Sequence, residues 1–261
     1  MSAAVCPPLT ITFLGTGTSS GVPMVGCDCE VCRSTDPNDK RLRSSIMVES
    51  ATTRFVVDTT PDFRYQMLRL GVKQLDAVLY THPHKDHMAG LDDVRPFNFF
   101  TKQPMKLYAN ELTADAIRRD FYYAFSEKKY PGVPNLDITT IDETPFFIGD
   151  IPITPILVWH LKMPVYGFRM GSFTYITDAN RIDPEEKNKA RGSKVLVLNA
   201  LRREAHISHF TLTEAIAMAN ELEAEEAYFT HISHQLGKHA DVSQELPNHI
   251  HLASDGTVLS L

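Results

Sequence analysis

The sequence lacks any apolar run of membrane-spanning length. Its apolar stretches, such as Ala77–Tyr80 and Val195–Leu198, are far shorter than the ~18 residues that a transmembrane helix requires. The segment Met1–Leu14 also lacks a basic region followed by an apolar core and a small-residue cleavage site, so it does not have the pattern of a secretory signal. These absences predict a cytoplasmic protein that does not associate with membranes.

An excess of basic residues is absent as well. The 261 residues include 26 Lys and Arg against 32 Asp and Glu, which gives a net charge of −6 with neutral histidines. This balance argues against a broad basic surface, so we do not expect nucleic acid or anionic lipid as a partner. With 43% hydrophobic and 22% charged residues, the chain has the composition of a globular protein that needs no metal merely to form a core.

No repeat, heptad pattern or low-complexity linker interrupts the chain, so we interpret residues 1–261 as a single domain. Short β-rich runs alternate with turn residues and with a few helical stretches. Because the strands outnumber the helices, this pattern favours an α/β layered architecture with two sheets. The predicted strands are Leu9–Leu14, Ser45–Glu49, Arg54–Asp58, Asp76–Thr81, Lys106–Tyr108, Ile151–Val158, Tyr166–Met170, Phe173–Thr177, Lys194–Leu198, Glu226–Thr230, His249–Ala253 and Thr257–Leu261.

Two predicted helices have clear start signals. Thr60, followed by proline, suits the N-cap of a helix over Pro61–Leu70, which glycine closes. Thr211 and Glu214 have the spacing of a capping box at the start of a helix over Leu212–Glu223.

Three further local predictions follow from turn residues and periodicity. A third helix is expected over Thr113–Ala124. Met170–Ser172 and Ser254–Gly256 have turn chemistry between β-rich runs, so each is predicted to join the two arms of a hairpin.

Histidine and aspartate are concentrated directly after the apolar run 77–80. His82 and His84 are two residues apart, so an extended backbone places both imidazoles on one side. Asp86 and His87 follow where the chain must turn, and they can face a second point. Four such ligands within six residues suit two metal ions ~3.5–4 Å apart better than one ion. The alternative is an exposed polar turn with incidental histidines.

This H-x-H-x-D-H pattern resembles the signature of the metallo-β-lactamase superfamily. The resemblance implies an αββα sandwich, in which two mixed β-sheets carry helices on their outer faces, and it extends over nearly the whole chain. It also implies that His160, Asp178 and His231 are metal ligands at strand ends. The implied ligands of one metal are His82, His84 and His160, those of the other are Asp86, His87 and His231, and Asp178 bridges the two.

Asp58 matches a carboxylate with which the superfamily orients a metal-bound histidine. Such an acceptor for the second imidazole N–H is what a metal-binding histidine requires. Its alternative role is to cap the turn into the predicted helix 61–70.

Three of the four cysteines lie close together, at Cys27, Cys29 and Cys32. In a reducing compartment this spacing indicates a metal rather than disulfides, and a structural zinc needs a fourth ligand from elsewhere. The cysteine loop and the stretch Thr230–His234 resemble the phosphodiesterase branch of the superfamily, typified by cyclic-phosphate phosphodiesterases. The resemblance implies that His234 completes a Cys₃His structural zinc site, which would position His231.

The implied dinuclear site, holding two divalent Zn or Mn ions, predicts hydrolysis of a phosphodiester or a similar bond by a metal-bound hydroxide. The expected substrate is a small, possibly cyclic, phosphodiester. The residues assigned catalytic roles are Asp86 and Asp178, which hold the ions, and His209, which matches an active-site histidine of the phosphodiesterase branch and would protonate the leaving oxygen. The alternative for His209 is a surface histidine at the start of a helix.

Other residues are candidate substrate contacts. The glycine-rich segment Gly15–Gly21 either offers backbone N–H groups to a phosphate or shapes the floor of the cleft. His239 is expected to border the pocket. Arg95 and Arg169 are either an anion clamp or partners in surface ion pairs.

Four alternative functions stay open. A tRNA-processing endonuclease of this fold would carry a basic arm, which the sequence does not contain. A thioester hydrolase would use the same ions to polarise a carbonyl, and an iron-dependent oxidoreductase would use similar ligands. A zinc-stabilised binding module without activity would have lost at least one ligand, whereas all seven positions are filled.

Overall fold

The computed structural model describes residues 6–128 and 130–261. Residues 1–5, which belong to the segment compared above with a secretory signal, lie outside the described residues, as does residue 129. Among the described residues, no helix combines the length and the apolar composition that crossing a bilayer requires.

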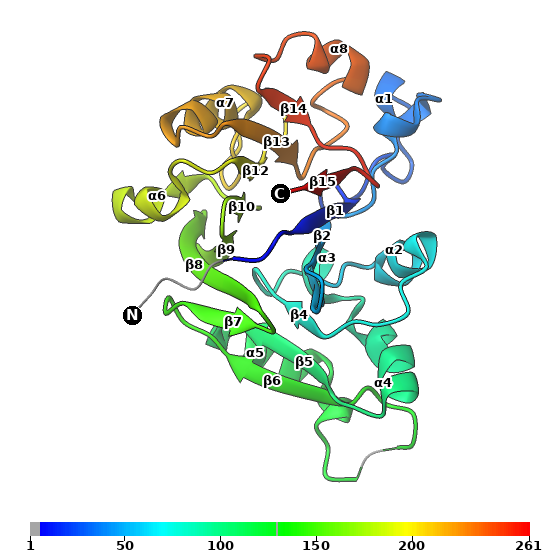
Figure 1. The fold of residues 1–261 in the computed structure, drawn as a ribbon. Helices are drawn as coiled ribbons and strands as arrows, with labels where there is room; N and C mark the ends of the chain where they lie inside the picture. The colour runs from blue at the N-terminus through cyan, green and yellow to red at the C-terminus, as the bar shows by residue number, and fades with distance from the viewer. Residues whose placement is uncertain (1–5, 129) are drawn as a thin grey trace.

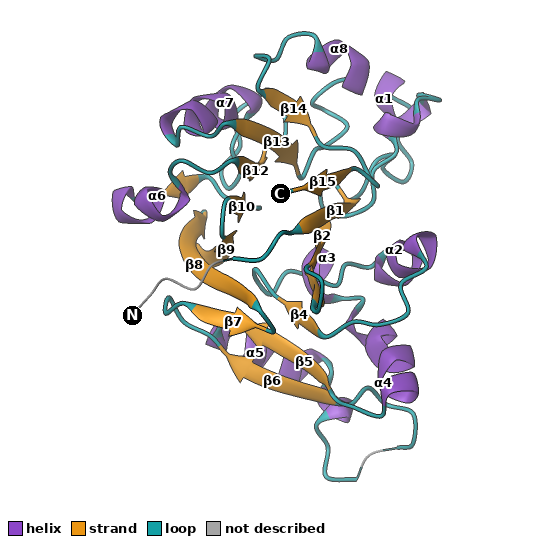
Figure 2. Ribbon diagram, viewed as in Figure 1, coloured by secondary structure: helices purple, strands orange, loops and turns teal. Residues whose placement is uncertain are grey.

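The chain forms two β-sheets that pack face to face, with helices on both outer sides (Figures 1 and 2). Between the sheets lies a core that includes Phe13 and Phe55 from one sheet and Phe168 and Tyr175 from the other. Two further cores separate each sheet from its own helices. The predicted αββα sandwich with two mixed sheets is therefore confirmed.

The first sheet brings together the strand ends that carry the His-Asp motif. Its strands, in spatial order, are β15 (Val258–Ser260), β1 (Thr10–Gly15), β2 (Ser45–Glu49), β3 (Arg54–Val57), β4 (Ala77–Leu79), β5 (Met105–Ala109) and β6 (Leu136–Thr140). Strands β3 to β6 are parallel, whereas β15, β1, β2 and β3 pair antiparallel. Because β3 and β4 run in the same direction, Asp58 and the segment beginning at Thr81 emerge at the same edge.

The second sheet brings Asp178 and His231 to a shared edge in the same way. Its strands, in spatial order, are β11 (Arg181–Ile182), β8 (Ile151–His160), β9 (Met163–Met170), β10 (Phe173–Tyr175), β12 (Val195–Asn199), β13 (Glu226–Thr230) and β14 (Ile250–Leu252), with β7 (Phe146–Ile148) paired to β8. Strands β10, β12, β13 and β14 are parallel. Their carboxyl ends therefore lie side by side.

The helices are short and lie mainly on the outer faces of the sandwich. They are α1 (Glu30–Arg33), α2 (Phe63–Leu70), α3 (Lys85–Met88), α4 (Arg95–Thr101), α5 (Glu111–Asp120), α6 (Pro184–Ala190), α7 (Leu212–Glu221) and α8 (His239–Ser243), with 3-10 turns at Pro37–Asp39, Leu91–Val94 and Tyr122–Ala124. The capping box of Thr211 and Glu214 at the start of α7 is confirmed. Gly71 closes α2 in the left-handed conformation, as predicted.

All three predicted helices have bounds that differ from those of the structure, and α7 ends at Glu221 rather than at Glu223. Helix α2 begins at Phe63 rather than at Pro61, because the Thr60 hydroxyl accepts a hydrogen bond from the Asp62 N–H at 3.1 Å and closes a separate turn first. The third helix runs over Glu111–Asp120 instead of Thr113–Ala124. Asn110 is its N-cap, and the segment after Asp120 tightens into a 3-10 turn.

The two predicted hairpins have different outcomes. Gly171 and Ser172 join the antiparallel strands β9 and β10, so that hairpin is confirmed. The hairpin at Ser254–Gly256 is wrong, since β14 and β15 belong to different sheets. The Asp255 carboxylate accepts hydrogen bonds from the Thr16 hydroxyl at 2.7 Å and from the Leu42 N–H at 2.8 Å, which carries the chain across to the first sheet.

Arg41 connects the loops that follow β1 and β14 with the start of α8. Its side chain is buried, with 5% exposure, and donates hydrogen bonds to the Thr16 hydroxyl at 2.8 Å and the Ala253 carbonyl at 2.5 Å. A third contact, at 3.0 Å, joins its guanidinium to His239 Nδ1. Burial lowers the pKa of Arg41 to about 10, and the nearby Asp255 carboxylate opposes this shift.

Replacing Arg41 with Met is expected to lower the free energy of unfolding by about 3 kcal/mol, because the Ala253 carbonyl and the Thr16 hydroxyl lose their buried donor and the Asp255 carboxylate loses a nearby positive charge. Urea denaturation measures the change. The control is Arg54→Met, which breaks a half-exposed pair with Glu49 and should cost less than about 1 kcal/mol. Equal losses in the two variants would contradict a structural role for Arg41.

Candidate metal centre

Asp178 lies at the centre of the histidine cluster, in the loop that follows β10. Its Oδ1 atom is 3.1 Å from His231 Nδ1 and 3.4 Å from His87 Nε2. Its Oδ2 atom is 3.2 Å from His209 Nε2 and 3.8 Å from His82 Nε2. The two oxygens of one buried carboxylate therefore face different imidazoles, which is the arrangement expected of a bridging ligand.

The structure brings the other six predicted ligand side chains together around this carboxylate. The ligand atoms of Asp86, His87, Asp178 and His231 lie within 4.8 Å of one another, as do those of His82, His84 and Asp178. His160 lies beside the second group, with its ring centroid 5.0 Å from that of His84. Their binding of metal stays a prediction.

Three imidazoles in the cluster have a buried nitrogen that needs a partner. Within the described part of the chain, no hydrogen bond reaches His82 Nε2, His87 Nε2 or His231 Nδ1. Unpaired buried nitrogens are rare and costly, so their presence at one point indicates a ligand there. The donor set of imidazoles and carboxylates is the one that divalent zinc and similar ions bind, so the residues fit a metal centre.

The opposite nitrogen of each of these rings is held by an oxygen atom. The Thr81 hydroxyl lies 2.9 Å from His82 Nδ1, and the Thr18 hydroxyl lies 3.2 Å from His231 Nε2. Proteins orient metal-binding imidazoles by such contacts on the nitrogen that does not face the metal. Thr18 was not predicted to serve the site, because its contact with His231 joins segments 213 residues apart.

Asp58 holds the third ring. Its Oδ2 atom is 2.7 Å from His87 Nδ1, and both carboxylate oxygens accept hydrogen bonds from Thr81, one from the N–H and one from the hydroxyl. The described hydrogen bonds of Asp58 thus run to the His-Asp motif rather than to the start of α2. This geometry agrees with the orienting role and not with the capping role.

Burial and nearby charges shift the pKa values of the ionisable groups in the cluster in different directions. Burial works against the charged form of Asp178, but His231 and His87 hold its pKa well below the ordinary value. Burial lowers the pKa of His231 to about 4 and that of His82 well below its ordinary value. Burial also opposes charge on His87, but Asp178, Asp86 and Asp58 together raise its pKa well above normal. Asp178 is thus ionised and His82 and His231 are neutral, which is the state in which these groups bind cations, whereas a cation would have to replace the proton that the three carboxylates favour on His87.

Backbone strain marks the same places. Asp58, Asp178 and His231 have φ angles of +68°, +55° and +56°, in the left-handed region that side chains other than glycine rarely adopt. Each such residue costs about 1–3 kcal/mol and persists only where packing enforces it. All three directly follow or nearly follow a strand, and the left-handed turn directs each side chain toward the cluster.

His209 lies within the cluster, beside Asp178, and is almost fully buried. Its Nδ1 atom lies 3.1 Å from the Ser208 hydroxyl and 3.1 Å from His206 Nδ1. His206 was not predicted as a site residue, although its spacing of three from His209 was a visible signal. Since His209, His160 and Asp178 also lie within ligand distance of one another, His209 is either a proton donor or an additional ligand.

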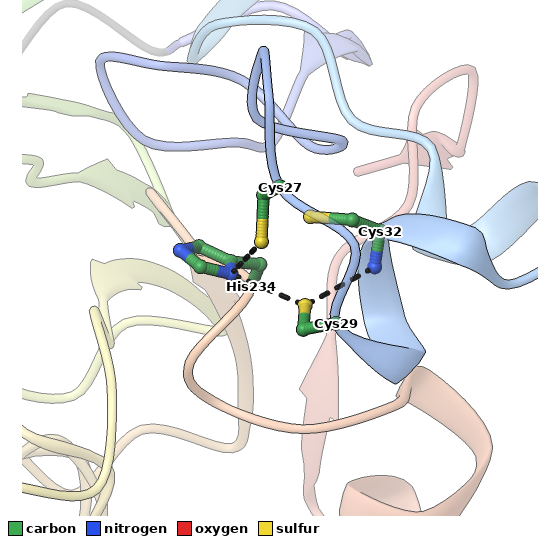
Figure 3. Close-up of side chains that lie close together, drawn as sticks. All are labelled: Cys27, Cys29, Cys32 and His234. Carbon is green, nitrogen blue, oxygen red and sulfur yellow. Dashed lines mark hydrogen bonds between the residues drawn. The ribbon is translucent and has the colours of Figure 1, made fainter.

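A second cluster joins the cysteine loop to the segment after β13 (Figure 3). His234 Nδ1 is 3.3 Å from Cys29 Sγ and 3.5 Å from Cys27 Sγ, and Cys32 completes a group within 4.8 Å. Tetrahedral zinc with the usual bond lengths separates sulfur and nitrogen ligands by roughly 3.6 Å. A hydrogen bond from the Cys32 N–H and the contact with His234 lower the pKa of Cys29 to about 6. These four residues therefore fit a structural zinc.

The remaining sequence candidates lie outside the cluster. Arg95 pairs with Asp92 at 2.8 Å, and Arg169 donates to main-chain carbonyls, so neither forms an anion clamp. In the segment Gly15–Gly21, the N–H groups of Gly17 and Thr18 donate hydrogen bonds to the carbonyls of Leu42 and Ile232. These N–H groups are therefore not available to a phosphate, which favours the role of shaping the cleft floor. His239, expected at the pocket border, contacts Arg41.

A family model described as a β-lactamase superfamily domain matches residues 53–232. The chain belongs to this superfamily. It is similar to a solved structure described as a new diphosphatase from the PhnP family, with 41% identity, 97% of each chain covered and a TM-score of 0.92. This membership agrees with the metallo-β-lactamase fold described above.

Two other similarities are less direct. The chain is 39% identical over 247 residues to the octanoyltransferase of Porphyromonas gingivalis, a match that covers 94% of this chain and 50% of that protein. The chain thus spans about half the length of this curated relative. Zn²⁺-bound PqqB from Methylobacterium extorquens is 20% identical, with 97% and 100% of the two chains covered and a TM-score of 0.79, and it shares the fold alone.

Replacing Cys29 with Ser is expected to lower bound zinc from three to two ions per chain, because a neutral hydroxyl is a poor zinc ligand. Activity should fall as well, since the cysteine loop holds the segment that carries His231. Elemental analysis of protein purified with zinc measures the content. Cys6→Ser, which changes a cysteine outside the cluster, is the control. An unchanged zinc content in Cys29→Ser would refute the assignment.

Proposed function

We propose that this protein is a hydrolase that cleaves a small phosphodiester, with two divalent metal ions at the centre built around Asp178. The position of this carboxylate supports the proposal best: its Oδ1 faces His87 and His231, while its Oδ2 faces His82 and His209. A single carboxylate shared in this way suits two ions rather than one. The proposed substrate is a small molecule, and a net charge of −6 argues against a nucleic acid.

The chain would hold the two ions with the residues already described. His82, His84 and His160 would hold one ion, Asp86, His87 and His231 would hold the other, and Asp178 would serve as a ligand to both. Bound Zn or Mn ions would supply Lewis acidity toward a phosphoryl oxygen and a source of hydroxide near neutral pH. Asp58, Thr81 and Thr18 keep the imidazoles oriented from behind.

His209 is the proposed proton donor to the leaving oxygen. Its Nε2 atom points to Asp178 Oδ2 at 3.2 Å, so it lies where the bond is cleaved. Contacts of its Nδ1 atom with Ser208 and His206 fix the ring from the other side. A positioned imidazole of this kind contributes to catalysis by protonating the leaving group as the bond breaks.

A diphosphate anhydride is the second candidate substrate. The relative with 41% identity over 97% of the chain is described as a diphosphatase. In a diphosphate that carries an organic substituent, the reacting phosphorus atom is linked through oxygen to two groups, as it is in a phosphodiester. The same metal ions and the same proton donor could therefore act on both kinds of substrate. A substrate screen must therefore include both diesters and anhydrides.

Acyl transfer or thioester hydrolysis is a weaker candidate. It draws on the octanoyltransferase name of the Porphyromonas gingivalis relative, which is about twice as long as this chain. An octanoyl thioester belongs in the same screen as a test of this activity. An iron-dependent oxidoreductase is distinguished by metal analysis and absorption spectroscopy.

Removing the metals is expected to abolish cleavage of bis(p-nitrophenyl) phosphate, because the proposed nucleophile is a hydroxide that the metal ions would generate. A chelator-treated sample should recover its activity when Zn²⁺ or Mn²⁺ is restored but not when Mg²⁺ is supplied, since imidazole-rich sites bind Mg²⁺ poorly. Full cleavage by protein shown to be metal-free would overturn the proposal.

The variant His209→Ala is expected to lower turnover about 100-fold while the metal content stays constant. The effect should be smaller for substrates with a p-nitrophenolate leaving group, which needs little protonation, than for alkyl phosphodiesters. His249→Ala, at a partly exposed histidine that is paired with Asn220 outside the cluster, is the control. Loss of metal from His209→Ala would make this residue a ligand instead, and unchanged turnover on alkyl substrates would remove it from the mechanism.

A further inference from the structure

Leu161 is both exposed and strained. It lies in the two-residue turn between β8 and β9, where His160 and Met163 pair, and its side chain is 50% exposed. Its φ angle of +59° falls in the left-handed region, which glycine and asparagine adopt at lower cost. Neither burial nor turn geometry therefore explains a leucine at this position.

Ile207 shows the same contradiction on the neighbouring loop. Its side chain is 72% exposed, although the residues on both sides of it are held tightly. His206 and Ser208 are joined through the His206 ring, and Ser208 is buried. A fixed loop thus holds a large aliphatic side chain in water.

One side chain ties the two residues together. Asn180 accepts a hydrogen bond from the Leu161 N–H at 2.9 Å through Oδ1 and donates one to the Ile207 carbonyl at 3.0 Å through Nδ2. Leu161 and Ile207 therefore lie on adjacent loops that the Asn180 amide joins.

Both loops border the metal centre on its open side. Leu161 directly follows His160, whose Nδ1 atom lies 2.9 Å from the Ser208 carbonyl and whose ring is 4.6 Å from that of His209. His84, whose ring is 5.0 Å from that of His160, is the solvent-exposed member of its ligand group. A substrate that enters past His84 and His160 consequently meets these loops.

We infer that Leu161 and Ile207 form an apolar lip that contacts a ring-bearing substituent of the phosphate substrate, such as an aryl group or a nucleobase. The inference rests on the proposed function, since it concerns the same centre. Exposed aliphatic side chains have a stabilising partner only when an apolar surface covers them, and strain that folding does not require is typical of a functional position. Substrates with small polar substituents gain nothing from the lip.

The test compares two ligands that share a phosphate and differ in one substituent. Phenyl phosphate and methyl phosphate are titrated into the zinc-loaded protein, and binding is measured by calorimetry. Wild-type protein is expected to bind phenyl phosphate more tightly. In the variants Leu161→Asn and Ile207→Ser, the affinity for phenyl phosphate should fall about ten-fold, whereas the affinity for methyl phosphate should stay unchanged. A factor of about ten is at the low end of what one apolar contact contributes to discrimination between two ligands.

Kinetics give a second readout. For bis(p-nitrophenyl) phosphate, both variants should raise KM by a similar factor with little change in kcat. This pattern is expected when the lost contact stabilises the bound substrate and the transition state equally. Leu161→Asn should not lower Tm, since asparagine accepts the left-handed φ more readily. Leu68→Asn, at an exposed leucine in the groove between α2 and α4, controls for the loss of an exposed leucine.

The outcomes separate the lip from the proposed function. Equal changes for both phosphates, or no change for either, in variants of normal Tm would overturn the lip even if the wild type cleaves phosphodiesters. Selective loss of phenyl phosphate binding supports the lip. A wild type that shows this selectivity without cleaving any phosphodiester would instead overturn the proposed function alone.

Discussion

A buried carboxylate surrounded by imidazole nitrogens without partners is the constraint on which the rest of this molecule depends. Asp178 is almost fully buried, and the nitrogens of His82, His87 and His231 that face it have no hydrogen bond among the described residues. Such an arrangement is unfavourable in a protein interior unless cations satisfy it. The remaining features of the fold hold these groups in place against that cost.

Strand direction is the main device. In the first sheet β3 and β4 are parallel, and in the second β10 and β13 belong to a parallel set, so their carboxyl ends meet on facing edges of the sandwich. Left-handed turns at Asp58, Asp178 and His231 then direct the side chains inward. Three hydrophobic cores keep the sheets and helices in register, which is why the strained turns persist.

The segment that carries His231 shows how strongly the site depends on distant parts of the chain. Its neighbour Ile232 exchanges main-chain hydrogen bonds with Thr16 and Thr18, and His234 contacts the cysteine loop. Arg41 donates hydrogen bonds to the Thr16 hydroxyl and to the Ala253 carbonyl. The N-terminal loops and the C-terminal turn therefore hold one candidate metal ligand from several directions.

The sequence by itself determined what depends on neighbouring residues. The His-Asp motif, the cysteine spacing, the capping box at Thr211 and the hairpin at Gly171 all act over a few residues, so each could be interpreted locally. Tertiary structure alone decided the turn at Asp255, which crosses between sheets because Thr16 and Leu42 bind its carboxylate. It also brought Thr18 to His231 and placed Leu161 and Ile207 on one edge through Asn180. Contacts between segments this far apart form only when the sheets pack, and no periodicity or spacing along the chain encodes them.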